Sequence, residues 1–174
     1  MSVLTIFSCL FAVLGCGCLG ILFSIPFKSR VKQLEEFYGV MDGLLLDIEF
    51  RNATLSDALE RMGKNCSGAV RDMLLYISKS IFEQRCIDMK KIWQKAADRF
   101  GNELFLSKED MEILLDFSKK LGCGDREHEK NNIKITMARL KLALDDAREL
   151  SVKNVKVYRG LGFLTGIFLV IVFV

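Results

Sequence analysis

The chain has 174 residues, of which 51% are hydrophobic and 27% are charged, and its formal net charge is +3. Every charged residue lies in 28–159, since residues 1–27 and 160–174 contain no Lys, Arg, Asp or Glu. One charged segment between two apolar ends argues against a freely soluble monomeric enzyme, and a net charge of +3 is too small for a surface that binds nucleic acid. The charged segment is long enough to bury one hydrophobic core.

Residues 1–27 are predicted to form a transmembrane anchor. The run from Val3 to Phe27 is uncharged and rich in Leu, Ile, Phe and Val, and a membrane-spanning helix needs about 20 such residues. A cleaved signal peptide is a weaker alternative, because residues 1–4 carry no positive charge. A lipoprotein signal ending at Cys16 lacks that charge too, and Leu14 stands where a smaller residue is expected, so it also remains a weaker alternative.

Basic residues follow the anchor directly, at Lys28, Arg30 and Lys32. The positive-inside rule therefore predicts that the domain after the anchor is cytoplasmic. We predict that these three side chains lie at the membrane interface.

The other apolar end is predicted to form a short C-terminal transmembrane helix over residues 155–174. Its uncharged part, 160–174, rises only about 22 Å as a helix, less than a hydrocarbon core of about 30 Å. Starting at Val155 gives 20 residues, provided that Lys156 and Arg159 extend their charged ends to the membrane surface. Tyr158 is then also expected at the interface, where aromatic rings are favoured. A buried core helix is the weaker alternative, because residues 167–174 are apolar on all sides.

Residues 28–159 are predicted to form an all-α bundle of about six helices, because apolar residues recur at spacings of three and four without sustained period-two alternation. The first helix is expected to bury one apolar stripe, namely Val31, Leu34, Tyr38, Met41, Leu45 and Ile48. Thr54, with Asp57 shortly after it, is expected to cap a second helix that ends at Gly63.

Four further helices follow, each with its own apolar stripe. The third is expected to bury Val70, Leu74, Ile77 and Ile81. The fourth ends before Gly101 and is expected to bury Met89, Ile92, Trp93, Ala96 and Phe100. The fifth is capped by Ser107 and Asp110 and is expected to bury Met111, Leu114, Leu115, Ser118 and Leu121. The sixth begins near Asp125 and is expected to bury Ile133, Met137, Leu140, Leu144 and Ala147.

The stripe of the sixth helix fades about two turns before the C-terminal apolar end, and no proline interrupts 125–174. We therefore predict that this helix packs in the bundle, leaves it, and runs on into the membrane.

The sequence predicts no catalytic, cofactor-binding or metal-binding residue. His128 is the only histidine and lies among charged residues at the start of the sixth helix, and no glycine-rich phosphate-binding motif is present. The cysteines lack the CxxC pairs of a zinc site. A cysteine in a reducing compartment usually serves as a small hydrophobic residue, although a redox pair of Cys66 and Cys123 stays open.

Acidic clusters are the remaining candidates for partner binding. Subtracting the six basic residues beside the apolar ends from 25 leaves 19 Lys and Arg against 22 Asp and Glu, so the body of the bundle is net acidic. One candidate is the pair Asp57 and Glu60, which share a helix face. The other opens the sixth helix and comprises Asp125, Arg126, Glu127 and Glu129. The alternative for both is that the acids only complement the positive end of a helix dipole.

Several segments resemble the stage III sporulation protein AB family. The resemblance is clearest around the sixth helix, in Leu121-Gly122, Asp125-Arg126-Glu127 and the run 156–163 (KVYRGLGF), which a short apolar tail follows. The run 54–61 (TLSDALER) resembles the second cytoplasmic helix of that family. The resemblance covers essentially the whole chain, and Glu129-Lys130 is a departure, since a glutamine is expected nearby.

The resemblance implies a helical cytoplasmic domain similar to those of the type II secretion platform protein F, and the lack of catalytic residues predicts a non-enzymatic protein. The resemblance also implies a place in the channel between mother cell and forespore of endospore-forming bacteria, in the mother-cell membrane around the forespore. The basic residues beside both apolar ends predict that both termini lie outside the cytoplasm. The implied partners are the stage III sporulation protein AA ATPase and other stage III sporulation A proteins, and the resemblance leaves a homo-oligomer open. A membrane-anchored signalling or sensor subunit remains the alternative function.

Overall fold

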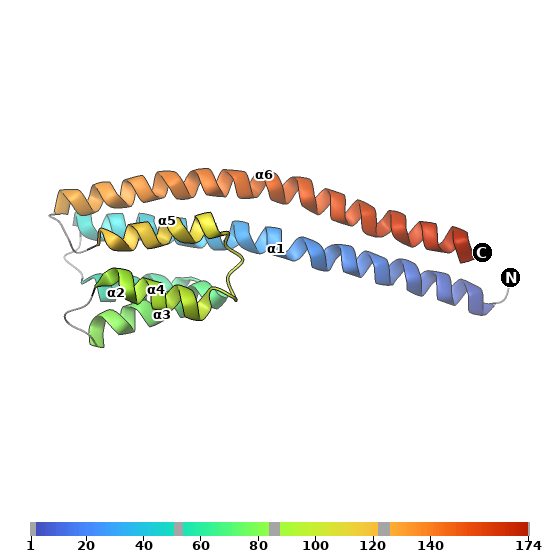
Figure 1. The fold of residues 1–174 in the computed structure, drawn as a ribbon, viewed down its shortest axis with the longest axis horizontal. Coiled ribbons are helices and arrows are strands. Elements are labelled where there is room, and N and C mark those ends of the chain that lie inside the picture. Colours follow the sequence, from blue (N-terminus) through green and yellow to red (C-terminus); the bar gives the residue numbers. More distant parts are fainter. Residues whose placement is uncertain (1–2, 51–53, 84–87, 122–125, 174) are drawn as a thin grey trace. The chain divides into compact units, whose positions relative to one another are not determined.

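The described residues of the chain form six helices and no strand (Figure 1). In this computed structural model the backbone is described for residues 3–50, 54–83, 88–121 and 126–173, and side chains are described in these ranges except at 3–21, 159, 161–163 and 166–173. The helices are α1 (Val3–Phe50), α2 (Leu55–Asn65), α3 (Gly68–Glu83), α4 (Met89–Phe100), α5 (Lys108–Lys119) and α6 (Arg126–Phe173). The predicted all-α fold of about six helices is therefore confirmed.

The chain divides into two compact units. The bundle unit is Lys32–Asp145, and the terminal unit combines Met1–Val31 with Asp146–Val174. The long helices α1 and α6 contribute residues to both. Within the part of the chain whose side chains are described, no helix is long and apolar enough to cross a membrane. Most of the two predicted transmembrane segments, 1–27 and 155–174, lies outside that part.

The core of the bundle unit is built from one apolar face of every helix. The largest fully buried side chain is Trp93 of α4, and its ring meets the ring of Phe117 from α5. The other fully buried large side chains are Phe37, Leu34, Met41, Leu44, Leu59, Met73, Leu74, Ile77, Leu114 and Ile133. Trp93 therefore lies in the core, as its helical spacing predicted.

The predicted stripe of α1 was partly wrong. Leu34 and Met41 are buried as expected, but Tyr38, Leu45 and Ile48 are only half-buried. The buried positions beside Leu34 and Met41 are instead Phe37, Val40 and Leu44. The physical reason is that α1 is apolar around more than half of its circumference here, so two overlapping stripes fit the helical spacing equally well. The stripe that is buried is the one without Tyr38, whose hydroxyl favours contact with water.

Residues outside the predicted stripes complete the core of the other helices. Met73 of α3, and Ile113 and Phe117 of α5, are buried, whereas Ile81 and Met111 are half-buried. Met137 of α6 is half-buried as well, and the polar residues Asn132 and Thr136 are buried near it in sequence. Asn132 donates its side-chain N–H to the carbonyl of Phe117 at 3.3 Å, so this polar group is satisfied inside the α5–α6 contact.

Polar contacts join α1 to several other parts of the bundle. Asp47 of α1 forms an ion pair with Arg61 of α2. Gln33 accepts a hydrogen bond from the backbone N–H of Phe105, between α4 and α5, at 2.7 Å. Glu49 lies 3.9 Å from Lys130 of α6. The C-terminal half of α1 therefore contacts α2, the α4–α5 loop and α6.

The predicted helix caps are present. Thr54 Oγ1 accepts a hydrogen bond from the backbone N–H of Asp57 at 3.2 Å. At α5, Ser107 and Asp110 form a complete capping box, in which each side chain accepts a hydrogen bond from the backbone N–H of the other. Such a box satisfies two backbone donors that a helix start otherwise leaves without a partner.

Candidate docking surface

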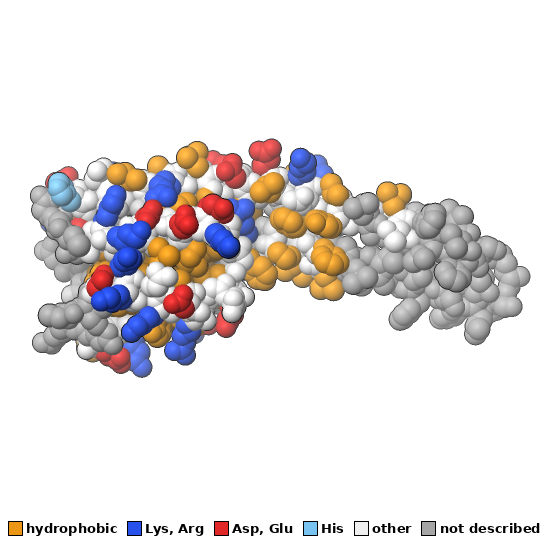
Figure 2. Space-filling view, in the orientation of Figure 1, with side chains coloured by type: hydrophobic (Ala, Val, Ile, Leu, Met, Phe, Trp, Pro, Cys, Tyr) orange, Lys and Arg blue, Asp and Glu red, His pale blue; other side chains and the backbone are white. Residues whose placement is uncertain are grey.

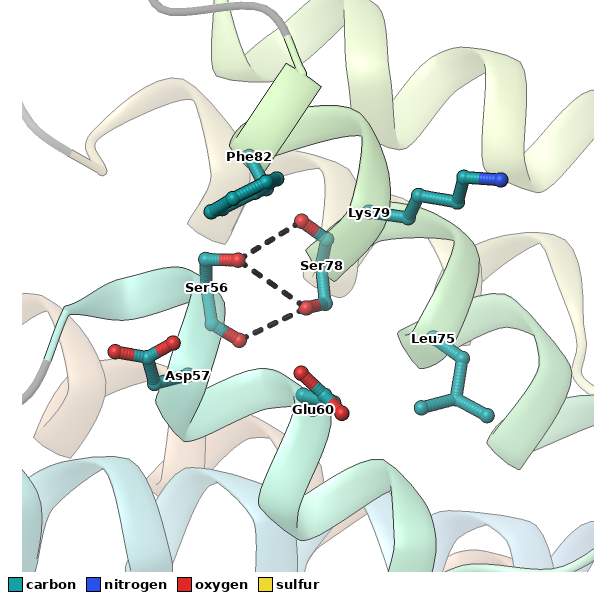
Figure 3. A pocket seen from close by; sticks show the side chains of 7 residues that line it. All are labelled: Ser56, Asp57, Glu60, Leu75, Ser78, Lys79 and Phe82. Carbon is teal, nitrogen blue, oxygen red and sulfur yellow. Dashed lines mark hydrogen bonds between the residues drawn. The ribbon is translucent and has the colours of Figure 1, made fainter.

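A groove of about 370 Å³ lies between α2 and α3 in the bundle unit. Its lining residues come from both helices and include the predicted partner-binding pair Asp57 and Glu60; the others are Ser56, Leu75, Ser78, Lys79 and Phe82 (Figure 3). The groove therefore combines acidic, basic, hydroxyl and aromatic groups.

Two serines fix the floor of this groove. Ser56 Oγ donates to the carbonyl of Ser78 at 3.0 Å, and Ser78 Oγ donates to the carbonyl of Ser56 at 2.9 Å (Figure 3). The two hydroxyl oxygens are 3.3 Å apart. Further along the same pair of helices, a Cβ at Gly63 would lie 3.1 Å from the Cβ of Leu74. Small residues thus let α2 and α3 approach closely, and reciprocal hydrogen bonds set their relative position.

The acidic residues form the α2 wall of the groove. Asp57 and Glu60 are both exposed, and Glu60 forms an ion pair with Lys64 at 2.6 Å. On the α3 wall Lys79 lies 3.7 Å from Glu83. These contacts are between exposed groups, and such pairs contribute only about 0–1 kcal/mol to stability. The charges are therefore available to a binding partner at little cost to the fold.

Phe82 is a groove residue that the sequence analysis missed. Its side chain is 77% exposed at the end of α3, and Figure 3 shows its ring beside the Ser56–Ser78 pair. The sequence did indicate that this phenylalanine is exposed, because Phe82 directly follows Ile81 and so falls outside the inward stripe of the third helix. Aromatic residues, Phe among them, are enriched at protein–protein interfaces, so the exposed Phe82 ring is a candidate partner anchor.

The second predicted cluster is partly occupied by internal contacts. Arg126 and Glu127 are exposed at the start of α6, Glu129 is half-buried, and Asp125 lies outside the described residues. Glu127 forms an ion pair with Lys130 at 3.1 Å, and Lys130 in turn lies near Glu49. This cluster therefore belongs to an ion-pair network that links α6 to α1, which makes it a weaker docking candidate than the α2–α3 groove.

The predicted membrane-interface residues lie in or beside the terminal unit. Lys28, Lys32, Lys156 and Tyr158 are exposed and Arg30 is half-buried, whereas the side chain of Arg159 is outside the described residues. The ring of Tyr158 stacks with the rings of Phe23 and Phe27 from α1, at centroid distances of 6.1 and 5.9 Å. This aromatic cluster was not predicted, because residues 23 and 158 are far apart in the sequence.

Figure 2 shows hydrophobic side chains gathered over this described part of the terminal unit, and interspersed acidic and basic ones over the bundle.

Cys66, at the C-terminal end of α2, is not an activated thiol. Partial burial, and secondarily the negative charge of Glu36, raise the pKa of the Cys66 thiol to about 11. Cys123 and Cys86 lie outside the described residues, so the redox pair considered for Cys66 and Cys123 stays untested. Among the described residues, no group of three His, Cys, Asp or Glu side chains is placed to hold a metal ion.

Comparisons with known proteins identify the family. A family described as stage III sporulation protein AB matches residues 5–174. A curated relative, stage III sporulation protein AB of Bacillus subtilis strain 168, is 24% identical over 145 residues, which cover 83% of this chain and 84% of the relative. A solved structure of a stage III sporulation protein AB has the same fold, with a TM-score of 0.65 and 21% identity over 71% of this chain and 96% of that one.

Proposed function

Because the chain belongs to the stage III sporulation protein AB family, we propose that it is a non-enzymatic platform component of the channel between mother cell and forespore. In this proposal the bundle unit binds a cytoplasmic secretion-type ATPase, the stage III sporulation protein AA, and couples it to a membrane assembly of stage III sporulation A proteins. The observation that carries the docking step is the α2–α3 groove, where exposed acids and an exposed aromatic ring lie on a rigidly paired set of helices.

We propose in addition that residues 1–27 and 155–174 anchor the chain in the mother-cell membrane around the forespore, with both termini outside the cytoplasm. The support is the sequence: two uncharged apolar ends, each next to basic residues on its inner side. The stacking of Tyr158 on Phe23 and Phe27 supports an interfacial aromatic cluster, since Tyr is favoured where apolar and aqueous regions meet.

The groove suits a partner segment with one basic and one apolar anchor. A Lys or Arg of the partner would face Asp57 and Glu60, and an apolar side chain would pack on Phe82 and Leu75, which line the same groove. Truncating a buried aromatic anchor typically costs about 2 kcal/mol or more of binding energy, whereas exposed charges chiefly affect the association rate and its salt dependence.

Charge reversal of Asp57 and Glu60 to Lys tests this docking. The full-length chain in lipid nanodiscs should lose affinity for the purified ATPase, and the loss should shrink as the salt concentration rises. Phe82→Ala should weaken binding by about 30-fold or more at every salt concentration.

The matched control is Asp98→Lys, which reverses an exposed acid on α4 outside the groove and should leave binding unchanged. Thermal unfolding should be nearly the same in all four proteins, because the altered side chains are exposed. Equal binding by wild type, the double reversal and Phe82→Ala would contradict the docking proposal.

A further inference from the structure

The outward face of α1 carries a second groove, which is unrelated to the proposed ATPase site. It measures about 440 Å³ and lies between α1 and α2. Four of its lining residues on the α1 side follow a helical spacing of four, three and four: Gly39, Gly43, Leu46 and Phe50. The fifth, Asp47, is buried and forms an ion pair with Arg61 of α2. Leu46 is 51% and Phe50 79% exposed, and a Cβ at Gly39 would meet nothing within 4 Å. The groove therefore has an open floor at one end and exposed large apolar side chains at the other.

Acidic residues flank this stripe on one side. Asp42 and Glu49 are exposed and stand seven residues apart, so they lie on the same side of α1. Glu49 is already 3.9 Å from Lys130 of its own copy. Asp42 is therefore the cleaner probe of an external charge partner.

The exposed face of α6 carries the complementary pattern. Ile135 is 46% and Leu142 68% exposed, and Ala138 between them is exposed too. Lys134 and Lys141 are exposed as well and flank this stripe seven residues apart. We call these two exposed stripes the α1 seam (Gly39, Gly43, Leu46 and Phe50) and the α6 seam (Ile135, Ala138 and Leu142). The α1 seam lies beside two acids, and the α6 seam lies beside two lysines.

We propose that the occupant of the α1 groove is the α6 seam of a second copy of this chain, packed antiparallel to α1. Ile135 and Leu142 are seven residues apart in the sequence, and so are Gly39 and Leu46. Placing Leu142 over the open floor at Gly39 of an antiparallel partner therefore brings Ile135 beside Leu46. In this register Lys141 lies about 3 Å along the helix axis from Asp42. Lys134 lies at the same axial distance from Glu49.

The side of each helix also agrees with an antiparallel pair. Successive residues of a helix are turned by about 100° about its axis, which gives the side of the seam on which each charge lies. Viewed along the chain direction, the acids Asp42 and Glu49 lie on one side of the α1 seam. The lysines Lys134 and Lys141 lie on the same side of the α6 seam. Antiparallel helices bring like rotational sides together, so acids face lysines. A parallel pair would place the lysines against the opposite flank of α1.

Two different faces of one chain are joined in this contact, so it is head-to-tail. Such contacts give a ring if the rotation closes and an open filament if it does not. The seams span only about three helical turns, so we expect the contact to bury less than about 1,200 Å², the lower end of the range for stable interfaces. We therefore expect the assembly to dissociate in dilute detergent and to form in membranes, where anchoring raises the effective concentration to about the millimolar range.

A photo-cross-linking amino acid at Phe50 tests the contact in the full-length chain reconstituted in lipid vesicles. The expected product is a covalent dimer whose second peptide maps to the exposed face of α6 within residues 131–142. Phe82 is the matched control, because it is also a phenylalanine, is 77% exposed and lies on α3; the same substitution there should give no dimer. Leu142→Glu should remove the Phe50 product.

A charge swap gives the second test. Asp42→Lys alone and Lys141→Glu alone should each lower the dimer yield by about tenfold, since each places like charges together. A mixture of the two variants should regain the cross-link as a heterodimer, and the double variant should regain it with itself. Both positions are exposed, so unfolding temperatures should not change.

Three results would overturn the proposal: cross-links from Phe50 to α1 of the other copy, no cross-link from Phe50 in vesicles, or charge variants that dimerise like the wild type. The outcome is independent of the proposed ATPase docking, because Asp57 and Glu60 are unchanged throughout.

Discussion

The indole ring of Trp93 meets the ring of Phe117 edge-on, with centroids 5.8 Å apart and planes at 84°. This geometry directs the positive edge of one ring at the negative face of the other, and it contributes about 0.5–1.5 kcal/mol beyond the buried area. Both side chains are essentially inaccessible to solvent. Within the described residues, the Trp93 Nε1 donor has no hydrogen-bond partner. Trp93 therefore stabilises the α4–α5 contact by packing and not by polar bonding.

Trp93→Ala is expected to lower the free energy of unfolding by about 3–5 kcal/mol, because it leaves a cavity at the centre of the core. Trp93→Phe should cost clearly less, since it keeps an aromatic ring and removes an unpaired donor. Urea unfolding followed by circular dichroism measures both. Equal losses for the two variants would contradict the packing role assigned to the aromatic ring.

Ser56 and Ser78 should be energetically coupled. Each single change to Ala removes one hydroxyl-to-carbonyl hydrogen bond together with the contact between the two hydroxyl oxygens, which costs about 0.5–1.5 kcal/mol. The remaining hydroxyl keeps its donation to the backbone carbonyl of the altered residue. The double change to Ala removes both hydroxyls, and its cost should be smaller than the sum of the single costs by about 0.5 kcal/mol or more. A double-mutant cycle from urea unfolding checks this, and strict additivity would show that the two hydroxyls act independently.

Asp116 should contribute to stability in a pH-dependent way. Hydrogen bonds from Lys119 and Arg139 lower the pKa of this exposed carboxyl. A carboxyl whose pKa is lower in the folded state stabilises the fold above its unfolded pKa of about 3.9, and this contribution disappears as the pH falls through the folded value. Asp116→Asn should therefore flatten the loss of stability below about pH 4. Thermal melts from pH 2.5 to 7 measure the effect, with Asp98→Asn as an exposed control.

The Cys66 thiol should react slowly with alkylating reagents in the folded protein. Its pKa is raised to about 11, and the thiolate is the reactive form. The alkylation rate of the Cys66 peptide, followed by mass spectrometry, should rise with pH up to about 11, whereas in urea it should level off near pH 8.5. Glu36→Gln should move the folded profile to lower pH, since the Glu36 charge contributes to the shift. A folded profile that matches the urea profile would contradict this assignment.

Two glycines should respond oppositely to alanine. Gly39→Ala should stabilise the fold in dilute detergent by about 0.5–1 kcal/mol, because a helical glycine is replaced where the new Cβ meets nothing. Gly63→Ala should destabilise it, because the Cβ would lie 3.1 Å from that of Leu74. Unfolding midpoints of the two variants distinguish these signs, and a stabilised Gly63→Ala would show that α2 and α3 can separate without cost.

The caps and cores of the short helices could be predicted because they depend on local sequence. Ser107 and Asp110 are three residues apart, and their capping box follows from that spacing alone. The buried face of α1 could not be predicted in the same way, since Phe37 and Tyr38 are both aromatic and only the neighbouring helices decide between them. Tertiary contacts likewise bring Tyr158 to Phe23, a pairing that no local pattern encodes.

The candidate site shows the same limit. The sequence indicated Asp57 and Glu60 as a shared face of the second helix, and the structure puts both in one groove. Phe82 and Lys79 enter that groove only because α3 packs closely on α2, through Ser56 and Ser78. Such convergence of two helices depends on their packing distance, which a single sequence does not provide.

The hydrogen bond between Gln33 and the Phe105 amide has a consequence for detecting motion of α1. Phe105 lies between α4 and α5, where no helix protects its N–H, so its exchange with deuterium is governed by a single acceptor on α1. Gln33 follows closely after the proposed N-terminal anchor. If a pull or rotation of that anchor displaces Gln33, we expect the Phe105 amide to exchange faster, so this backbone hydrogen can report displacement of α1 from an element far away in the sequence.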